Sequence, residues 1–295
     1  MQGYNLRTRK NIIKTPRLVV SSTQHQINGL RDKQEDFIYI GNVNRYRTLY
    51  IITDGHGGDQ CSKFTIEFVK QAVDTFSKKY KDMKSLFAFV VLAAHDAWAI
   101  HIFGDAKYRS PETLAERANT LQQVIPELGT SYVDKGGMSG TTLVCCMIDR
   151  KTKQICFCNL GDSRAVMLKN EMFYATRDHS VPKKLTHLIG TEFETFAATQ
   201  MVGTIQRVNG DLSVSAAIGD YSPSLLGLLQ SKPDINMFPL DEDAIVILGS
   251  DGLWNAVDCQ HLFLNPLLDA KDVIAHCQDV SDNTSAILIV CTICP

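Results

Sequence analysis

Five aspartates stand where an apolar, strand-like run meets a turn, a position from which a sheet can present carboxylates to a ligand. They are Asp36, Asp54, Asp162, Asp251 and Asp282. Carboxylates gathered from distant parts of a chain repel one another, because each like-charged neighbour raises the cost of ionising the next. A hard divalent cation removes that cost, and oxygen ligands without a nearby cluster of cysteine or histidine favour Mg²⁺ or Mn²⁺ over Zn²⁺. The acids therefore predict a carboxylate metal site if they converge in the fold.

A simpler interpretation of these acids stays open at this level. Asp54-Gly55 and Asp251-Gly252 are ordinary turn dipeptides, and two of them in a chain of 295 residues need no catalytic explanation. Spacing alone does not choose between turns and a metal site.

Eight short segments with β-branched and aromatic residues could position these acids as strands of a sheet-rich core. They are residues 17–23, 36–41, 47–53, 141–148, 154–159, 164–168, 244–248 and 285–291. Four further stretches predict helices, two of them long and amphipathic or apolar. These are residues 59–76, 83–103, 111–128 and 257–264. Strands, a block of helices and then more strands indicate an α+β sandwich rather than a doubly wound fold.

The composition limits the class of protein. The chain carries a net charge of −2, so it has no global basic field to attract nucleic acid. No linker of Pro, Gly or Ser divides it, so we expect residues 17–295 to form a single domain behind a basic arm at residues 1–16. The arm lacks a secretory core, and no run approaches the eighteen apolar residues of a membrane span. We expect a monomer in the cytoplasm or nucleus, with no nucleic-acid or membrane partner and with its nine cysteines reduced.

Eight short motifs follow one another along the chain. They are Arg31-Asp-Lys-Gln-Glu35-Asp36, Asp54-Gly-His-Gly-Gly58, Ser139-Gly-Thr-Thr142, Asn159-Leu-Gly-Asp-Ser-Arg164, Asp178-His179, Arg207 running to Gly219-Asp220, Ser250-Asp-Gly-Leu-Trp254 and Asp282-Asn283. Together they resemble the motifs of the metal-dependent serine/threonine protein phosphatases of type 2C, the PPM family. The resemblance covers residues 19–290. Each motif is weak alone, but eight in the family's order are highly specific.

The resemblance implies a fold and a metal centre. The fold would be α+β, a central β-sandwich of two antiparallel sheets flanked by α-helices on both sides. Asp54 would bridge two metal ions at one end of the sandwich, with Asp36 also at the centre. By motif position Glu35 and the Gly55 carbonyl would bind one ion, while Asp251 and Asp282 would bind the other.

The resemblance also implies the reaction, which is hydrolysis of phosphoserine and phosphothreonine in phosphorylated proteins. Water held between two metals about 3.5–4 Å apart loses its proton readily and attacks phosphorus directly. Arg31 would bind the substrate phosphate, which suits its planar fork of donors. His56 would be the general acid for the leaving oxygen, since its ordinary pKa of about 6.5 leaves it partly protonated at neutral pH. Without the resemblance, Arg31 could equally be a surface ion pair and His56 a helix cap.

Two departures from the family pattern concern a third, weaker ion. Ala216 stands where members commonly have arginine, and Asn255 stands where they usually have aspartate. In several members that aspartate, with the counterparts of Asp162 and Asp251, helps to hold the third ion. Asn255 keeps an oxygen ligand but loses a charge, so a third ion should bind less tightly here. The segment about residues 180–200 corresponds to the flap beside the site.

Two alternatives to a protein phosphatase remain. One is a catalytically impaired pseudophosphatase that serves as a binding or regulatory module. The other is a metal-dependent esterase for small phosphate esters. Retention of six site residues, Arg31 and His56 among them, favours an enzyme over a scaffold.

Overall fold

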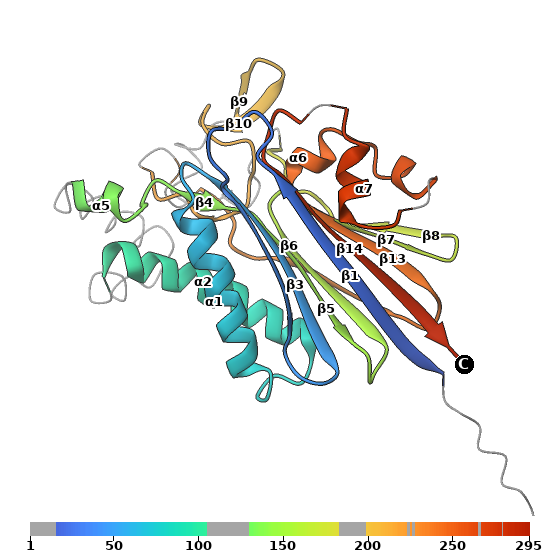
Figure 1. Cartoon of the computed structure of the whole chain (residues 1–295). Helices are drawn as coiled ribbons and strands as arrows, with labels where there is room; N and C mark the ends of the chain where they lie inside the picture. Colours follow the sequence, from blue (N-terminus) through green and yellow to red (C-terminus); the bar gives the residue numbers. More distant parts are fainter. Residues whose placement is uncertain are drawn as a thin grey trace, which may run out of the picture.

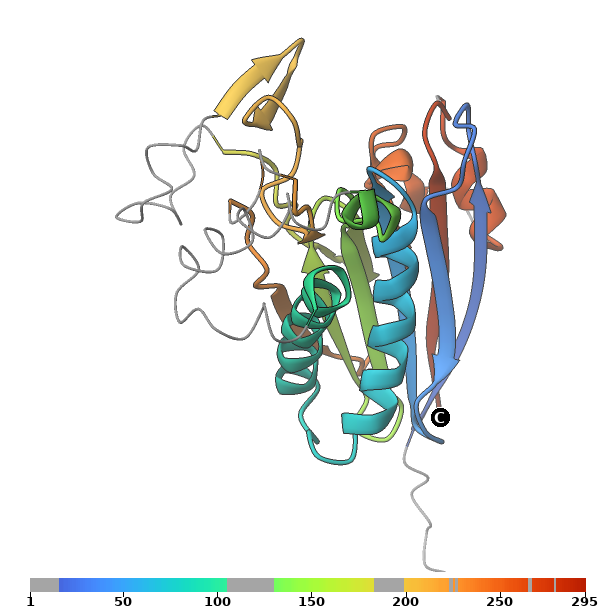
Figure 2. The ribbon, with the colours of Figure 1, turned by 90° about the vertical axis from the view of Figure 1, so that its left-hand side faces the viewer.

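A computed structural model gives the fold of the chain (Figure 1). It describes residues 16–104, 130–182, 199–222, 225, 228–264, 267–278 and 280–295. The described elements form four layers, helices on sheet on sheet on helices, as Figure 2 shows from the side. This is the α+β sandwich that the sequence predicts.

The first sheet has five antiparallel strands in the order β1-β14-β13-β7-β8. Their bounds are Arg17–Ile27, Thr284–Cys294, Ala244–Gly249, Arg164–Lys169 and Met172–Ala175. In β13, Gly249 pairs with Ala286 of β14 on one side and with Arg164 of β7 on the other. The register therefore brings the end of β13 and the beginnings of β7 and β14 to one edge.

The second sheet has seven strands in the order β11-β4-β3-β5-β6-β12, with β2 also paired to β3. In chain order, β2 to β6, β11 and β12 span Asp36–Asn42, Arg47–His56, Gly140–Thr141, Leu143–Asp149, Gln154–Leu160, Ile218–Gly219 and Asp234–Pro239. A separate hairpin pairs β9, Thr199–Val202, with β10, Ile205–Val208. It projects from the body of the molecule in Figure 2.

Helices cover the outer faces of both sheets. The seven-stranded sheet carries α1, Gln60–Phe76, and α2, Met83–Phe103, while the five-stranded sheet carries α6, Asp251–Trp254, and α7, Ala270–Ala275. Shorter pieces are α5, Thr130–Asp134, and a 3₁₀ helix at His261–Leu264. Asp82 begins α2 and Asp269 begins α7, each by accepting a hydrogen bond from a backbone N–H of the first turn.

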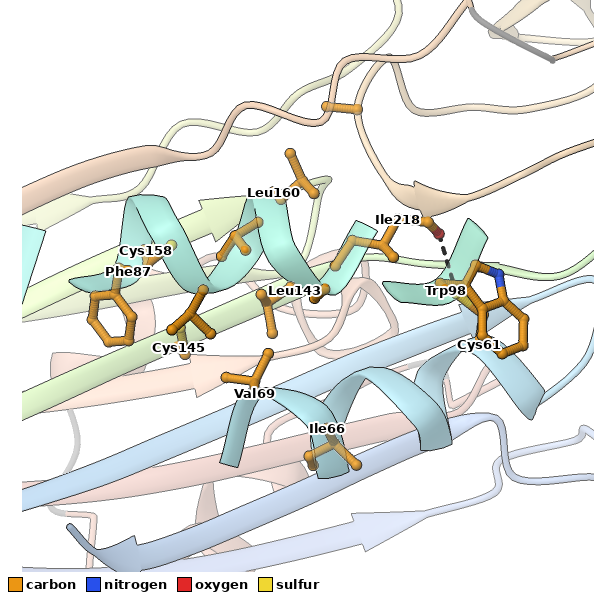
Figure 3. Close-up of a cluster of buried hydrophobic side chains, with 14 of the residues drawn as sticks. Cys61, Ile66, Val69, Phe87, Trp98, Leu143, Cys145, Cys158, Leu160 and Ile218 are labelled. Atoms are coloured by element: carbon orange, nitrogen blue, oxygen red, sulfur yellow. Dashed lines mark hydrogen bonds between the residues drawn. The ribbon is translucent and has the colours of Figure 1, made fainter. Parts of the chain in front are cut away.

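The central strands β3, β5, β13 and β14 are almost continuously apolar because both of their faces are buried. Along β3, Leu49 and Ile51 face α1 and α2, whereas Tyr50 and Ile52 face the other sheet. The same alternation places Val246 of β13 between the sheets and Ile247 under α6 and α7. Figure 3 shows the helix-side core, where Cys145, Val69 and Phe87 meet. Three clusters of buried apolar side chains therefore hold the four layers together.

All eight predicted strands are present, and so are the two long helices. The predicted helix at 257–264 is wrong in extent, because Asp258 begins a turn by accepting from the backbone N–H groups of Gln260 and His261, and only residues 261–264 are helical. Local patterns do not predict β8 to β12, which are short, nor the short helices α5 and α6. The predicted helix at 111–128 lies outside the described residues, as do most of the basic arm and of the flap.

One helix departs from the expectation that no segment reaches the length and hydropathy of a membrane span. Over 18 residues of α2 the mean hydropathy is 1.8, and among the described helices it alone has this combination of length and composition. Half of that window is buried inside the fold. Leu86, Val90 and Trp98 belong to the core beneath α1. The apolarity of α2 is therefore used in packing, as in the core helix of a globular domain.

Candidate active site

Asp54 lies near the end of β3, at the upper end of the sandwich in Figure 1, and has acidic neighbours from other strands. Asp36 is its direct partner across the β2–β3 ladder. The Asp251 backbone N–H, at the start of α6, points to the Asp54 Oδ2 at 3.5 Å. Burial raises the pKa of Asp54 well above its usual range, and the charges of Asp36, Asp251 and Asp162 raise it further. The structure thus brings together acids that lie as much as 215 positions apart.

Asp36 lies deepest of these acids, with 1% of its surface exposed. The Ser285 hydroxyl donates to its Oδ2 at 2.7 Å, which joins the two sheets at this point. Among the described residues its Oδ1 meets no hydrogen-bond partner. Burial raises the pKa of Asp36 to about 6, although hydrogen bonds from Ser285 and Ser250 offset part of the rise. A buried carboxylate with an unpaired oxygen is costly, and a cation nearby would remove that cost.

Asp162 and Asp251 complete the buried part of the cluster. Burial raises the pKa of Asp162 to about 7, with the charges of Asp251 and Asp178 adding to it. Burial also raises the pKa of Asp251, and the nearby charge of Asp282 adds to that rise. Five carboxylates from five segments therefore share one electrostatic environment. Mutual repulsion of this kind is typical of a site that a cation neutralises.

The cluster fits a divalent cation by its chemistry rather than as a closed cage. Among the described residues, no three His, Cys, Asp or Glu side chains already surround one point in a ligand arrangement. Mg²⁺ usually keeps several water ligands and needs only a few direct carboxylates. An all-oxygen set with an unpaired buried oxygen at Asp36 is compatible with such an ion, and carboxylate oxygens suit Mg²⁺ or Mn²⁺ better than Zn²⁺.

Arg31 and Glu35 reach the same edge from the loop between β1 and β2. The Arg31 Nη2 donates to the Asp282 Oδ2 at 2.7 Å, while 58% of the Arg31 side chain stays exposed. The Glu35 carbonyl accepts from the Gly55 backbone N–H at 3.1 Å and from the Ser62 hydroxyl at 2.7 Å. A Cβ at position 55 would lie 2.6 Å from the Ser62 Oγ. Only glycine fits at this point, because the Glu35 carbonyl and the Ser62 side chain of α1 lie too close to leave room for a Cβ.

His56 contacts an acid outside the metal cluster. Its Nε2 lies 2.7 Å from the Oδ1 of Asp220, which is 3% exposed. Burial lowers the pKa of the His56 imidazole, but the charge and hydrogen bond of Asp220, together with the charges of Asp162 and Glu35, outweigh burial and raise it. Asp220 has a φ of +58°, and its carboxylate fills the space above Gly140, where a Cβ would lie 2.2 Å from the Asp220 Oδ2. The left-handed backbone at Asp220 and the absence of a side chain at Gly140 thus let this carboxylate face the imidazole.

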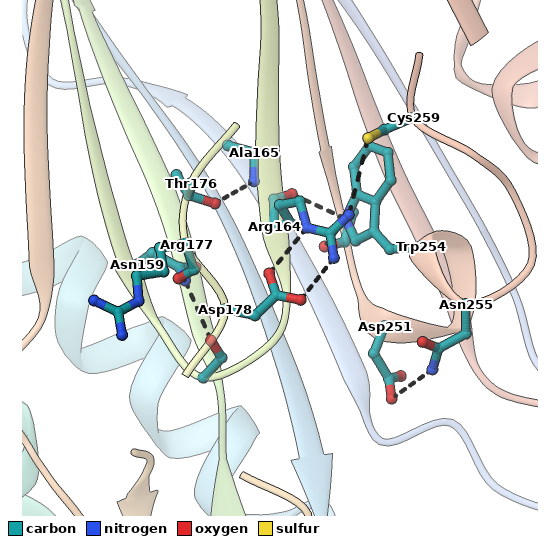
Figure 4. A network of polar contacts seen from close by, with 12 residues as sticks. Asn159, Arg164, Ala165, Thr176, Arg177, Asp178, Asp251, Trp254, Asn255 and Cys259 are labelled. Carbon is teal, nitrogen blue, oxygen red and sulfur yellow. Dashed lines mark hydrogen bonds and ion pairs between the residues drawn. The ribbon is translucent and has the colours of Figure 1, made fainter. Parts of the chain in front are cut away.

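A second network supports the site from the side of β7. The Arg164 Nε and Nη2 donate to the two oxygens of Asp178 at 2.9 and 2.6 Å (Figure 4). The guanidinium also lies over the Trp254 ring, 5.7 Å from its centroid, and the indole N–H donates to the Arg164 carbonyl at 3.0 Å. The network joins β7, the loop after β8 and α6. It therefore holds the segment that begins with Asp251.

The comparison with protein families decides the relationship of the chain. The family model described as protein phosphatase 2C matches residues 20–263. The chain belongs to the protein phosphatase 2C family. Rat protein phosphatase 1B is 31% identical over 239 residues, which are 76% of this chain and 55% of the relative. The probable protein phosphatase 2C 60 of Arabidopsis thaliana is 27% identical over 267 residues, covering 80% of this chain and 72% of that protein.

Solved structures agree with the 2C fold. The serine-threonine phosphatase 2C of Toxoplasma gondii superposes with a TM-score of 0.61 at 15% identity, over 94% of this chain and 100% of that one. The catalytic domain of the phosphatase PstP, solved with two manganese ions, gives a TM-score of 0.58 at 18% identity and covers 93% and 99%. Identities this low establish the fold alone. The chain spans about half the length of the first curated relatives that it matches, 55% and 56%.

The two departures from the 2C motifs have different surroundings. The Asn255 Nδ2 donates to the Asp251 Oδ2 at 3.2 Å, so the amide supplies a donor to this acid (Figure 4). Ala216 is buried in the core beside α2, where its neighbours are apolar. Asn255 thus touches the acidic cluster, whereas Ala216 contributes to packing.

Sequence reasoning missed three residues of this 2C site as functional candidates. Asp220, Asp178 and Asn283 each stand in a quoted motif. Asp178 meets Arg164 only 14 positions away, whereas the partners of Asp220 and Asn283 lie much farther along the chain. Asp220 contacts His56 across 164 positions, and the Asn283 side chain holds the Glu35 backbone N–H across 248 positions. Their presence in the motifs would have been enough to mark these residues as functional candidates. The motifs could not indicate which residue each side chain meets.

Proposed function

We propose that the chain is a Mg²⁺- or Mn²⁺-dependent protein serine/threonine phosphatase that hydrolyses phosphoserine and phosphothreonine monoesters. The observation that carries the proposal is the convergence of five carboxylates from five segments beside Arg31 and His56. Membership of the protein phosphatase 2C family supports it. The activity is a proposal for the whole protein, because the curated relatives are longer than this chain.

Seven residues would hold the ions. Asp54 would join two ions, with Glu35 and the Gly55 carbonyl toward one and Asp251 and Asp282 toward the other. Asp36 would act from beneath Asp54, and Asp162 with Asp251 would hold a third, weaker ion. Two bound ions would supply an ionised water at neutral pH and neutralise charge on the phosphoryl group. The raised pKa values of Asp36 and Asp162 support the need for positive charge here.

Arg31 would bind the phosphate of the substrate. Asp282 uses the Nη2 group of its guanidinium, and the exposed side chain has further N–H donors in the same plane. A planar fork can donate two parallel hydrogen bonds to phosphate oxygens, which fixes the orientation of the ester as well as its position. Arg31 thus aligns the phosphorus with the acidic cluster.

His56 would protonate the departing seryl or threonyl oxygen. Its Nε2 is engaged by Asp220, so the Nδ1 is the nitrogen left to face the leaving group. A raised pKa keeps a larger fraction of the imidazole protonated at neutral pH, which a general acid requires. Asp220 would hold the ring in place through the whole proton transfer. We propose phosphorylated proteins as substrates and a cytoplasmic or nuclear monomer as the working form.

The test is release of phosphate from a phosphothreonine peptide by purified protein, with and without Mn²⁺. Asp54→Ala and Asp251→Ala are measured beside the wild type, and Leu86→Ala, in α2, reports the effect of a core change alone. We expect Mn²⁺-dependent release that both aspartate variants lose. No metal-dependent release from the wild type, or undiminished release by both variants, would sink the catalytic assignment and favour the pseudophosphatase. Turnover of aryl phosphate without turnover of the peptide would indicate a small-ester phosphatase.

A further inference from the structure

The Asn283 side chain makes three hydrogen bonds to one loop. It lies between Asp282 and the start of β14 and is 6% exposed. Its Oδ1 accepts from the Glu35 backbone N–H at 2.8 Å. Its Nδ2 donates to the Asn28 carbonyl at 3.1 Å and to the Lys33 carbonyl at 3.0 Å. One amide thus satisfies three backbone groups of segment 28–35, and the opposite amide orientation would lose all three.

Segment 28–35 carries two of the residues that the proposed function uses. They are Arg31, which meets Asp282 at 2.7 Å, and Glu35, whose backbone carbonyl accepts from the Gly55 N–H. Asp282 is itself tied to Asn283, whose backbone N–H donates to the Asp282 Oδ1 at 2.7 Å. Asn283 therefore contacts both sides of the Arg31–Asp282 pair, the loop through its side chain and the acid through its backbone.

The loop is packed closely against the same segment at Gly29. This residue has a φ of +62°, and a Cβ there would lie 2.3 Å from the carbonyl oxygens of both Asp282 and Val280. The other amide in the loop, Gln34, donates to the Ile27 carbonyl and to the Asn28 Oδ1. The Gln34 bonds join the loop to the end of β1 and the start of β2 and make no direct contact with the Asp282 segment. Among the described side chains, Asn283 is the one whose amide ties this loop to the Asp282 segment.

We propose that Asn283 is a positioning residue. By holding segment 28–35 against the start of β14, it places the Arg31 guanidinium beside Asp282, where Arg31 can bind phosphate. The proposal rests on the proposed function for the role of Arg31. Losing three partly buried hydrogen bonds leaves the loop free to shift. A displacement of about 1 Å in a group that binds the transferring phosphoryl group costs roughly a hundredfold in rate. Asn283 acts through Arg31 and touches no substrate itself.

The experiment measures binding of inorganic phosphate to the Mn²⁺-loaded protein by calorimetry, in a double-mutant cycle. Asn283→Ala and Asn283→Asp are each combined with Arg31→Ala. The aspartate variant keeps the shape and the acceptor for Glu35 but loses both donors, so it guards against misfolding of the alanine variant. We expect each Asn283 change to weaken phosphate binding roughly tenfold when Arg31 is present, from the loss of three hydrogen bonds in the alanine variant and two in the aspartate variant, and less than twofold in Arg31→Ala.

The cycle separates positioning from a general loss of structure. Equal weakening in both backgrounds would overturn the proposal, because a charge effect or a global destabilisation does not depend on Arg31. Asn44→Ala is the matched control. The Asn44 Oδ1 also holds two backbone N–H groups of a turn, those of Tyr46 and Arg47, and that turn carries no site residue. We expect phosphate affinity in Asn44→Ala within twofold of the wild type.

Amide hydrogen exchange provides a readout that needs neither turnover nor phosphate. In Asn283→Ala the Glu35 amide should exchange at least tenfold faster, while the Ile51 and Ile52 amides in β3 keep their protection. Unchanged exchange at Glu35 would overturn the proposal. A wild-type protein that binds no phosphate would contradict the proposed function instead. In that case the exchange measurement still decides whether Asn283 holds the loop.

Discussion

The Nε2 of His56 and the Oδ1 of Asp220 lie 2.7 Å apart, although 164 positions separate the two residues in the chain. Asp220 is almost fully buried and held by its own left-handed backbone, so the imidazole meets a fixed partner. The pair joins the end of β3 to the loop after β11 at the acidic edge of the sandwich.

The His56–Asp220 pair predicts a dependence on the leaving group. His56→Ala and Asp220→Asn should both lose about 10²-fold or more in kcat with a phosphothreonine peptide, because the alkoxide must then leave without a proton. Both should lose much less with an activated aryl phosphate, whose leaving group needs none. The measurement is the ratio of kcat for the two substrates. A ratio unchanged from that of the wild type in both variants would remove His56 from the general-acid role.

The acidic cluster predicts a metal-dependent gain in stability. An ion that binds the folded chain but not the unfolded one stabilises it by about 2.7 kcal/mol at a concentration of 100 times its Kd. We expect Mn²⁺ to raise the midpoint of thermal unfolding of the wild type, and EDTA to reverse the rise. Asp54→Ala should show a smaller rise. An equal rise in Asp54→Ala would place the stabilising ion elsewhere.

The contact between Asn255 and Asp251 predicts how tightly a third ion binds. Its amide donates to the Asp251 Oδ2, so it contributes a donor where an acidic side chain would contribute charge. Asn255→Asp should therefore tighten the weakest Mn²⁺ binding step about tenfold or more, as one added carboxylate strengthens an oxygen site. Calorimetric titration of Mn²⁺ measures this step. Asn255→Ala is the matched control, since it removes the donor without adding charge, and tightening in that variant would contradict the interpretation.

The Arg47–Asp149 pair predicts a loss of stability in acid. Burial would raise the pKa of Asp149, but the Arg47 guanidinium and the backbone N–H groups of Thr152 and Lys151 outweigh it and lower the pKa below 3.8. The folded state thus prefers the ionised form. Its contribution is complete above pH 3.8 and is lost as the pH falls through the lower folded value.

Asp149→Asn should cost about 2 kcal/mol in the free energy of unfolding at pH 7, because the side chain is 6% exposed and loses a charged hydrogen bond at 2.8 Å. The difference in the free energy of unfolding between Asp149→Asn and the wild type should narrow below pH 3.8. Denaturant titration at pH 7 and below pH 3.8 will measure it. The Lys70–Glu67 pair on α1, with side chains 39% and 54% exposed, serves as the control, since solvent screens it and Glu67→Gln should change nothing measurable. A constant cost of Asp149→Asn at both pH values would exclude ionisation as its cause.

The strands were predictable because of a specific property of this fold. In β3, β5, β13 and β14 both faces are buried, so each reads as a run of β-branched and apolar residues. The missed strands β9 to β11 are short, β9 is mostly exposed and β10 is only partly buried, so neither periodicity nor hydrophobicity marks them. The helix predicted at 257–264 gave way to a turn because the Asp258 side chain competes for the backbone N–H of Gln260.

The sequence by itself determined the family, the strand core and the acids that stand at strand ends, because local patterns of side chains carry that information. Only the tertiary structure decided that Asp220 meets His56, that Asn283 holds the loop of Arg31, and that Asp36 is the deepest acid. Each of these contacts joins residues 164 or more positions apart, and sheet register with loop packing sets which of them meet. No pattern within a single segment contains that register, because it follows from how the two sheets and their helices bury their apolar faces together.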